Sequence, residues 1–156
     1  MGGPASLKIA CAFFGKELTE QRLADLSSAT AEEGASHAGL IKAAKAVGAT
    51  VYEMKDATIA DLRRFVHEQH LPVIVGWQPP VLPGLTLHAD GKKPKDHYSV
   101  ISLISDSYIH MYDPSMRTGL RRMPRREFLD LWWDRDTPTS PKSKRWLLAI
   151  EYPGHK

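Results

Sequence analysis

The sequence contains one cysteine among its 156 residues, Cys11, so an internal disulfide framework is excluded and a reducing compartment is favoured. It also has no apolar run near the roughly 20 residues that cross a bilayer, since the longest runs, such as Leu71 to Trp77, have the length of a strand. The first residues lack the basic segment followed by an apolar one that marks a secretory signal peptide. These absences predict a cytoplasmic protein without a membrane span.

The sequence is equally poor in signals for metal or nucleic acid. None of its 7 histidines pairs with another at metal-ligand spacing beside acids or thiols, so we expect no metal and no cofactor. The net charge is +3, and a basic excess in the second half is interpreted first as a solvated face. A nucleic-acid partner is a weaker alternative, because no aromatic residues interleave with the basic ones in a known binding motif. The basic residues are Arg117, Arg121, Arg122, Arg125, Arg126, Lys142, Lys144 and Arg145.

A hydrophobic fraction of 42% and a charged fraction of 25% are ordinary for a globular chain, and the length suits a single domain over residues 1–156. The first half of the sequence predicts helices. One begins at Pro4 and is apolar on nearly every side, a second follows Thr19, and a third begins after Ser36 and ends at Gly48.

Strands dominate the rest of the chain, and the expected elements follow a simple order. A strand, a helix capped by Asp56 or Thr58, and a buried strand lead into a long loop, after which come a hairpin, a short strand, a short helix and a last strand. Helices first and an antiparallel sheet afterwards indicate an α+β domain with N-terminal helices packed on a C-terminal sheet. The expected ranges are Ala49–Met54, Leu71–Trp77, Gln78–Lys95 (the loop), Tyr98–Ile104, Tyr108–Tyr112, Leu120–Met123, Arg125–Trp133 (the short helix) and Trp146–Tyr152.

Two polar residues stand at the ends of neighbouring strands. A tight turn at 105–107 would place Asp113 opposite Ser99 and diagonal to His97 on one sheet face, a separation that these side chains can bridge. A carboxylate there can fix the tautomer of the imidazole and stabilise its cation. A purely structural His–Asp pair remains the alternative.

Nucleophilic catalysis would need a third group near the start of the first helix, where the helix dipole favours a thiolate. Gly2 and Gly3 precede the expected helix start and carry no nucleophile. Cys11 lies half a helical turn out of phase with Gly2 and about 13 Å along the axis, so we interpret it as a core residue.

An ordered set of short motifs resembles the bacteriocin-processing cysteine peptidases, which have a papain-like fold. These motifs are Gly3-Pro4-Ala5-Ser6-Leu7, Gly39-Leu40 with Ala43-Ala44 and Val47-Gly48, Asp61-Leu62, Leu71 to Val75 with Trp77, Asp96-His97-Tyr98-Ser99-Val100, and Tyr112-Asp113-Pro114-Ser115 with Phe128. The resemblance implies that His97 is the general base and Asp113 its orienting carboxylate. It also places the nucleophilic cysteine at Gly2 and an oxyanion glutamine before it, and neither is present in this sequence.

Three histories fit the missing cysteine: a truncated or misassigned start, an engineered loss, or a natural pseudoenzyme. The expected partner is a peptide or protein substrate. The alternative function is a non-catalytic peptide-binding module that uses the same cleft, with a loop containing Trp77, Pro79, Pro80 and Leu82 as one wall.

Overall fold

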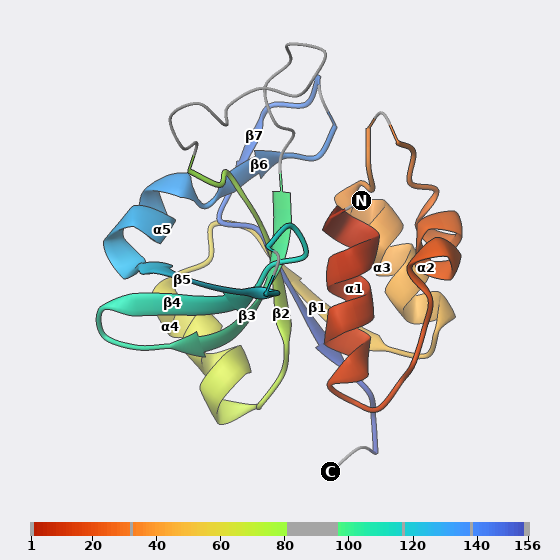
Figure 1. Ribbon diagram of the computed structural model, residues 1–156, viewed down its shortest axis with the longest axis horizontal. Helices are drawn as coiled ribbons and strands as arrows, with labels where there is room; N and C mark the ends of the chain where they lie inside the picture. The colour runs from red at the N-terminus through yellow and green to blue at the C-terminus, as the bar shows by residue number, and fades with distance from the viewer. Residues whose placement is uncertain (1, 32, 81–96, 117, 138, 155–156) are drawn as a thin grey trace.

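The computed structural model describes residues 2–31, 33–80, 97–116, 118–137 and 139–154. Its helical part comprises α1 (Gly2–Ala12), α2 (Glu20–Ser27) and α3 (His37–Ala46), which stand together on one side of the sheet (Figure 1). The Thr19 and Ser36 side chains accept hydrogen bonds from the first turns of α2 and α3, and Gly48 follows α3 with φ of 95°. The helix starts expected after Thr19 and Ser36, and the helix end expected at Gly48, are therefore confirmed.

The main strands are β1 (Thr50–Met54), β2 (Val73–Trp77), β3 (His97–Ile104), β4 (Tyr108–Tyr112), β5 (Leu120–Pro124) and β8 (Leu147–Glu151). They form one antiparallel sheet of six strands in the order β1-β8-β2-β3-β4-β5. Between β1 and β2 lie α4 (Ile59–Arg63), capped by Thr58, and a π-helical turn, η1 (Arg64–Glu68). The short helix α5 (Arg125–Leu131) follows β5, and a separate hairpin pairs β6 (Trp133–Arg135) with β7 (Lys142–Lys144).

The centre of the sheet is buried on both faces. On one face, Leu7 of α1 and Leu40 of α3 share a core cluster with Ile74 of β2. On the other face, Phe128 of α5 shares a second cluster with Val75. Because consecutive strand residues point to opposite faces, every residue of β2 is buried and its sequence is continuously apolar.

The α+β prediction is confirmed, with small corrections to element ends. The first helix begins at Gly2 rather than Pro4, and the short helix ends at Leu131 rather than Trp133. The separate β6–β7 hairpin was not predicted, because three-residue strands carry too little periodicity to recognise. The predicted loop from Gln78 to Lys95 lies outside the described residues from position 81 onward.

No described helix has both the length and the apolar character required to cross a bilayer.

Candidate active site

His97 and Asp113 lie beside each other where two neighbouring interior strands of the main sheet, β3 and β4, begin and end respectively. His97 is the first residue of β3, and Asp113 directly follows β4. Val100 pairs with Tyr112, which puts the next positions outward, Ser99 and Asp113, across from each other. A bulge between Ile101 and Leu103 compensates for a hairpin turn that is longer than expected, so this register agrees with the predicted one.

The ring of His97 contacts the carboxylate of Asp113 through one nitrogen. Nε2 of His97 donates a hydrogen bond to Oδ1 of Asp113, and the same oxygen accepts bonds from the backbone N–H of Ser115 at 3.0 Å and from its hydroxyl at 2.8 Å. Asp113 is fully buried, whereas the side chain of His97 is 14% exposed. The acidic partner is thus shielded from solvent while the imidazole remains accessible.

The environment of Asp113 keeps its carboxyl group ionised. Burial by itself raises the pKa of Asp113, but the hydrogen bond and charge of His97, together with the two hydrogen bonds from Ser115, lower that pKa from 3.8 to about 2. A carboxylate that is ionised at neutral pH, placed at Nε2, favours the tautomer of neutral His97 that carries its proton there. The other ring nitrogen, Nδ1, is then able to accept a proton.

Nδ1 of His97 is turned toward the first residue of α1. A Cβ atom added to Gly2 would lie 3.4 Å from Nδ1 and 3.7 Å from Cε1 of His97, at ordinary contact distance. Gly2 is a residue of α1 itself, so a side chain at this position would sit at the amino end of a helix. This is the environment in which a thiol loses its proton most readily.

A family model matches residues 2–135 of the chain, and its description is the Peptidase C39 family. The chain belongs to the Peptidase C39 family. The match covers the helices, His97, Asp113 and the first strand of the small hairpin. No curated protein matches the chain.

Solved structures of C39 peptidase domains share the fold. The peptidase domain of Streptococcus ComA, a bifunctional ABC transporter involved in quorum sensing, has a TM-score of 0.68 at 20% identity over 97% of this chain and 90% of that one. A putative C39-like peptidase from Bacillus anthracis has a TM-score of 0.67 at 14% identity over 99% and 90% of the two chains. A double glycine motif protease from an AMS/PCAT transporter, solved with its leader peptide, has a TM-score of 0.64 at 18% identity over 96% and 82%. The fold of this C39 domain is therefore papain-like, as the sequence motifs predicted.

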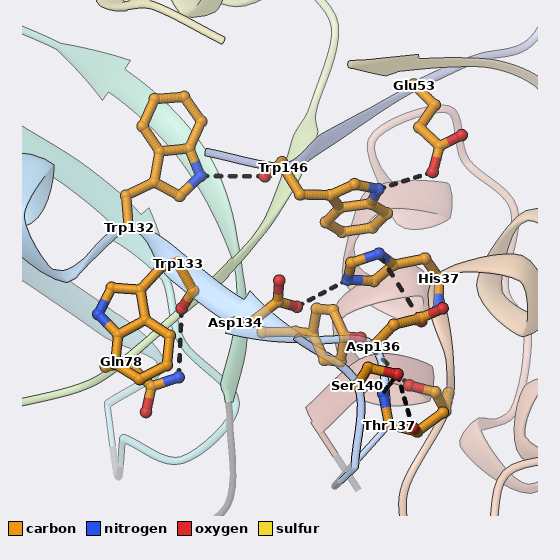
Figure 2. A network of polar contacts seen from close by, with 12 residues as sticks. His37, Glu53, Gln78, Trp132, Trp133, Asp134, Asp136, Thr137, Ser140 and Trp146 are labelled. Atoms are coloured by element: carbon orange, nitrogen blue, oxygen red, sulfur yellow. Dashed lines mark hydrogen bonds and ion pairs between the residues drawn. The ribbon is translucent and has the colours of Figure 1, made fainter. Parts of the chain in front are cut away.

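This C39 domain contains a second His–Asp pair, which the sequence did not reveal. Nε2 of His37 lies 2.7 Å from Oδ2 of the fully buried Asp134, and its Nδ1 lies 3.7 Å from Oδ1 of Asp136 (Figure 2). The ring stacks on Trp146 with centroids 3.9 Å apart and planes 8° apart, and the indole of Trp146 donates to Glu53 at 2.8 Å.

The second pair is suited to holding the fold together rather than to catalysis. The surroundings of the two histidines differ. His37 lies beside a cavity of about 440 Å³, whereas His97 lies beside Gly2 at the amino end of α1. Nε2 of His37 is bound to Asp134, Nδ1 lies 3.7 Å from a carboxylate oxygen of Asp136, and the ring is only 5% exposed, so little of it is open to a substrate. The pair instead joins the start of α3 to the β6–β7 hairpin.

Three expectations for individual residues need correction or qualification. Arg121 was interpreted as a solvated charge, but its side chain is 19% exposed and its Nε lies 2.8 Å from Oδ2 of Asp113. Trp77 was proposed as part of an open cleft wall, but it is fully buried in β2 and donates through Nε1 to Ser99. Leu82, from the same proposed wall, lies outside the described residues.

Cys11 is a core residue, as expected. It is fully buried, and burial raises the pKa of its thiol, which a hydrogen bond from the Tyr152 hydroxyl offsets only in part. The natural thiol of this chain is therefore both inaccessible and protonated at neutral pH.

Proposed function

We propose that this C39 domain has the architecture of a cysteine peptidase whose nucleophile position is occupied by Gly2, and that it is inactive as a thiol peptidase in this form. The observation that carries the proposal is the 3.4 Å separation between Nδ1 of His97 and a Cβ built on Gly2. Glycine has no side chain that can attack a carbonyl carbon, so the general base has no nucleophile to activate.

The proposed roles follow from the contacts of each residue. With a cysteine at position 2, Nδ1 of His97 would take the thiol proton as the sulfur bonds to the scissile carbonyl carbon. The imidazolium would then give that proton to the departing amine nitrogen, and water would release the acyl group. Asp113, on Nε2, orients the ring and stabilises the imidazolium.

The substrate class that we propose is a peptide with a double-glycine motif. One of the similar structures is described as a double glycine motif protease in complex with its leader peptide. The small side chains of such a motif would let an extended peptide backbone approach the amino end of α1, where Gly2 and the ring of His97 meet.

The test is to place a cysteine at position 2 and to measure its acidity. Gly2→Cys is prepared with a glutamine-containing segment upstream, and the rate of alkylation is followed against pH. We expect the new thiol to react as a thiolate well below pH 8.5, and Gly2→Cys/His97→Ala to lose this property. The unmodified chain serves as the background control, because its Cys11 is buried and should not react. A thiol that titrates near 8.5, as in an unstructured peptide, would contradict the proposal.

The alternative is a peptide-binding module that no longer needs catalysis. The observation in its favour is that His97 and Asp113 keep their contact although position 2 carries no nucleophile. A labelled double-glycine peptide distinguishes the two functions. Binding by the unmodified chain that survives His97→Ala, together with no cleavage by any Gly2→Cys form, would favour the module over the peptidase.

A further inference from the structure

The two carboxylate oxygens of Asp113 have different partners. Oδ1 accepts all the hydrogen bonds from His97 and Ser115. Oδ2 is buried and faces the guanidinium of Arg121, whose Nε lies 2.8 Å away. The N–H of Arg121 is not aligned for a hydrogen bond with this oxygen, so the pair is joined by charge at short range.

Arg121 is itself held in place by its neighbours. It pairs with Met111 across β4 and β5, and its guanidinium lies over the ring of Trp77, 5.2 Å from the centroid. Nη2 of the Arg121 guanidinium donates to the thioether sulfur of Met116 at 3.3 Å. A planar cation fixed on an aromatic face loses little freedom when it pairs with a carboxylate.

We propose that Arg121 is a positioning residue of the site, which fixes the Asp113 carboxylate and, through it, the ring of His97. This inference rests on the proposed function, because a positioned imidazole matters only if His97 acts on a group at position 2. Arg121 itself does not touch that position in the described contacts.

The physical argument concerns rotation and charge. Without a cation at Oδ2, only the two hydrogen bonds from Ser115 to Oδ1 would oppose rotation of the carboxylate about its Cβ–Cγ bond, and the imidazole could then meet either oxygen in more than one orientation. A buried carboxylate without sufficient compensating charge also becomes easier to protonate. Protonated Asp113 would no longer require the proton of neutral His97 to reside on Nε2, so Nδ1 would be protonated in part of the molecules and unable to act as a base.

The test is made on the chain with Gly2 unchanged, with and without substitutions at Arg121, and it needs no catalytic activity. The carboxyl carbon of Asp113 is titrated by NMR, and the tautomer of His97 is read from its ring ¹⁵N shifts at neutral pH. In Arg121→Gln we expect the pKa of Asp113 to rise by about 1 or more, and a mixed tautomer at His97. If Arg121 only stabilised the fold, Arg121→Gln would lower the free energy of unfolding without changing the pKa of Asp113 or the tautomer of His97.

The neighbouring arginine is the matched control. Arg122 lies on the same strand but contacts the ring of Tyr108, 4.3 Å from the centroid, so Arg122→Gln should leave the pKa of Asp113 and the His97 tautomer unchanged. If Arg121→Gln leaves both signals unchanged in a folded chain, the inference is overturned.

Two further variants keep the test decisive if Arg121→Gln fails to fold. Arg121→Met retains an apolar contact with Trp77 and removes the charge, so it should reproduce the rise in the pKa of Asp113. Arg121→Lys restores the charge and should bring that pKa most of the way back, and equal values in the Met and Lys variants would overturn the inference.

An unreactive thiol in Gly2→Cys would contradict the proposed function without changing these measurements. Conversely, a reactive thiol combined with an unchanged Asp113 would overturn only the role of Arg121.

Discussion

Gly76 of β2 lies directly against Asp134 of the His37–Asp134 pair. A Cβ atom added to Gly76 would lie 2.2 Å from Oδ2 and 2.6 Å from Cγ of Asp134. Oδ2 is the same oxygen that contacts Nε2 of His37 at 2.7 Å (Figure 2). Gly76→Ala therefore forces either the strand or the carboxylate to move.

The cheaper of these two movements sets the cost of the substitution. Overpacking that shifts a well-packed strand costs typically about 1–3 kcal/mol. Turning Asp134 away leaves a fully buried carboxylate without His37, and breaking such a pair costs about 3–5 kcal/mol. We therefore expect Gly76→Ala to lower the free energy of unfolding by about 2–3 kcal/mol, a large part of the 5–15 kcal/mol typical of a domain.

Urea unfolding followed by tryptophan fluorescence measures this loss, and a double-mutant cycle assigns it. In an Asp134→Ala background the two closest atoms are gone and the nearest remaining one, Cβ, lies 3.2 Å away, so Gly76→Ala should cost less than about 1 kcal/mol there. Gly2→Ala is the matched control, because its new Cβ meets nothing nearer than 3.4 Å. A cost below about 0.5 kcal/mol for Gly76→Ala, or an equal cost in both backgrounds, would refute this reasoning.

Three further predictions concern stability. Since the pKa of Asp113 is lowered to about 2, its ionised form contributes about 2 kcal/mol to the free energy of unfolding above pH 4, and this contribution is lost as the pH falls toward 2. Urea unfolding across this pH range should show the loss, and Asp113→Asn should remove that part of the pH dependence. Ser36→Ala removes the hydroxyl that caps Gly39 at 3.0 Å and should cost about 1 kcal/mol in chemical unfolding, whereas no loss would argue against the cap. Trp146→Phe removes the 2.8 Å indole bond to Glu53 and should cost about 1–2 kcal/mol in the same assay, and an unchanged midpoint would show that the bond contributes nothing.

Features set by neighbouring residues were predictable from the sequence. Ser36 and Thr58 cap helices because their side chains reach backbone N–H groups only three residues ahead, and a short window contains both partners. The apolar run ending at Trp77 predicted a buried strand for the same reason. The register of His97 against Asp113 needed only one hairpin, although the bulge that produces it has no clear mark in the sequence.

Features that depend on distant partners were not predictable. His37 and Asp134 are 97 residues apart, and their contact requires the β6–β7 hairpin to be placed first. The sequence did contain a sign that Arg121 points inward, since residues two apart in a strand share a face and Met123 is buried. We nevertheless predicted a solvent-exposed side chain, because Arg121 lies in a basic stretch. That assumption failed because the buried carboxylate of Asp113, which directly follows the neighbouring strand β4, compensates the charge.

The two His–Asp pairs show why residue types alone do not define a catalytic site. Both pairs join an imidazole Nε2 to a fully buried aspartate. In one, Nδ1 of His37 lies 3.7 Å from the second carboxylate, of Asp136, and the ring is covered by Trp146 and only 5% exposed, so little of it is open to a substrate. In the other, Nδ1 of His97 meets the amino end of a helix, where a group that loses a proton is stabilised. The chemical difference lies in what faces the second nitrogen, and at His97 that is decided by the side chain at position 2.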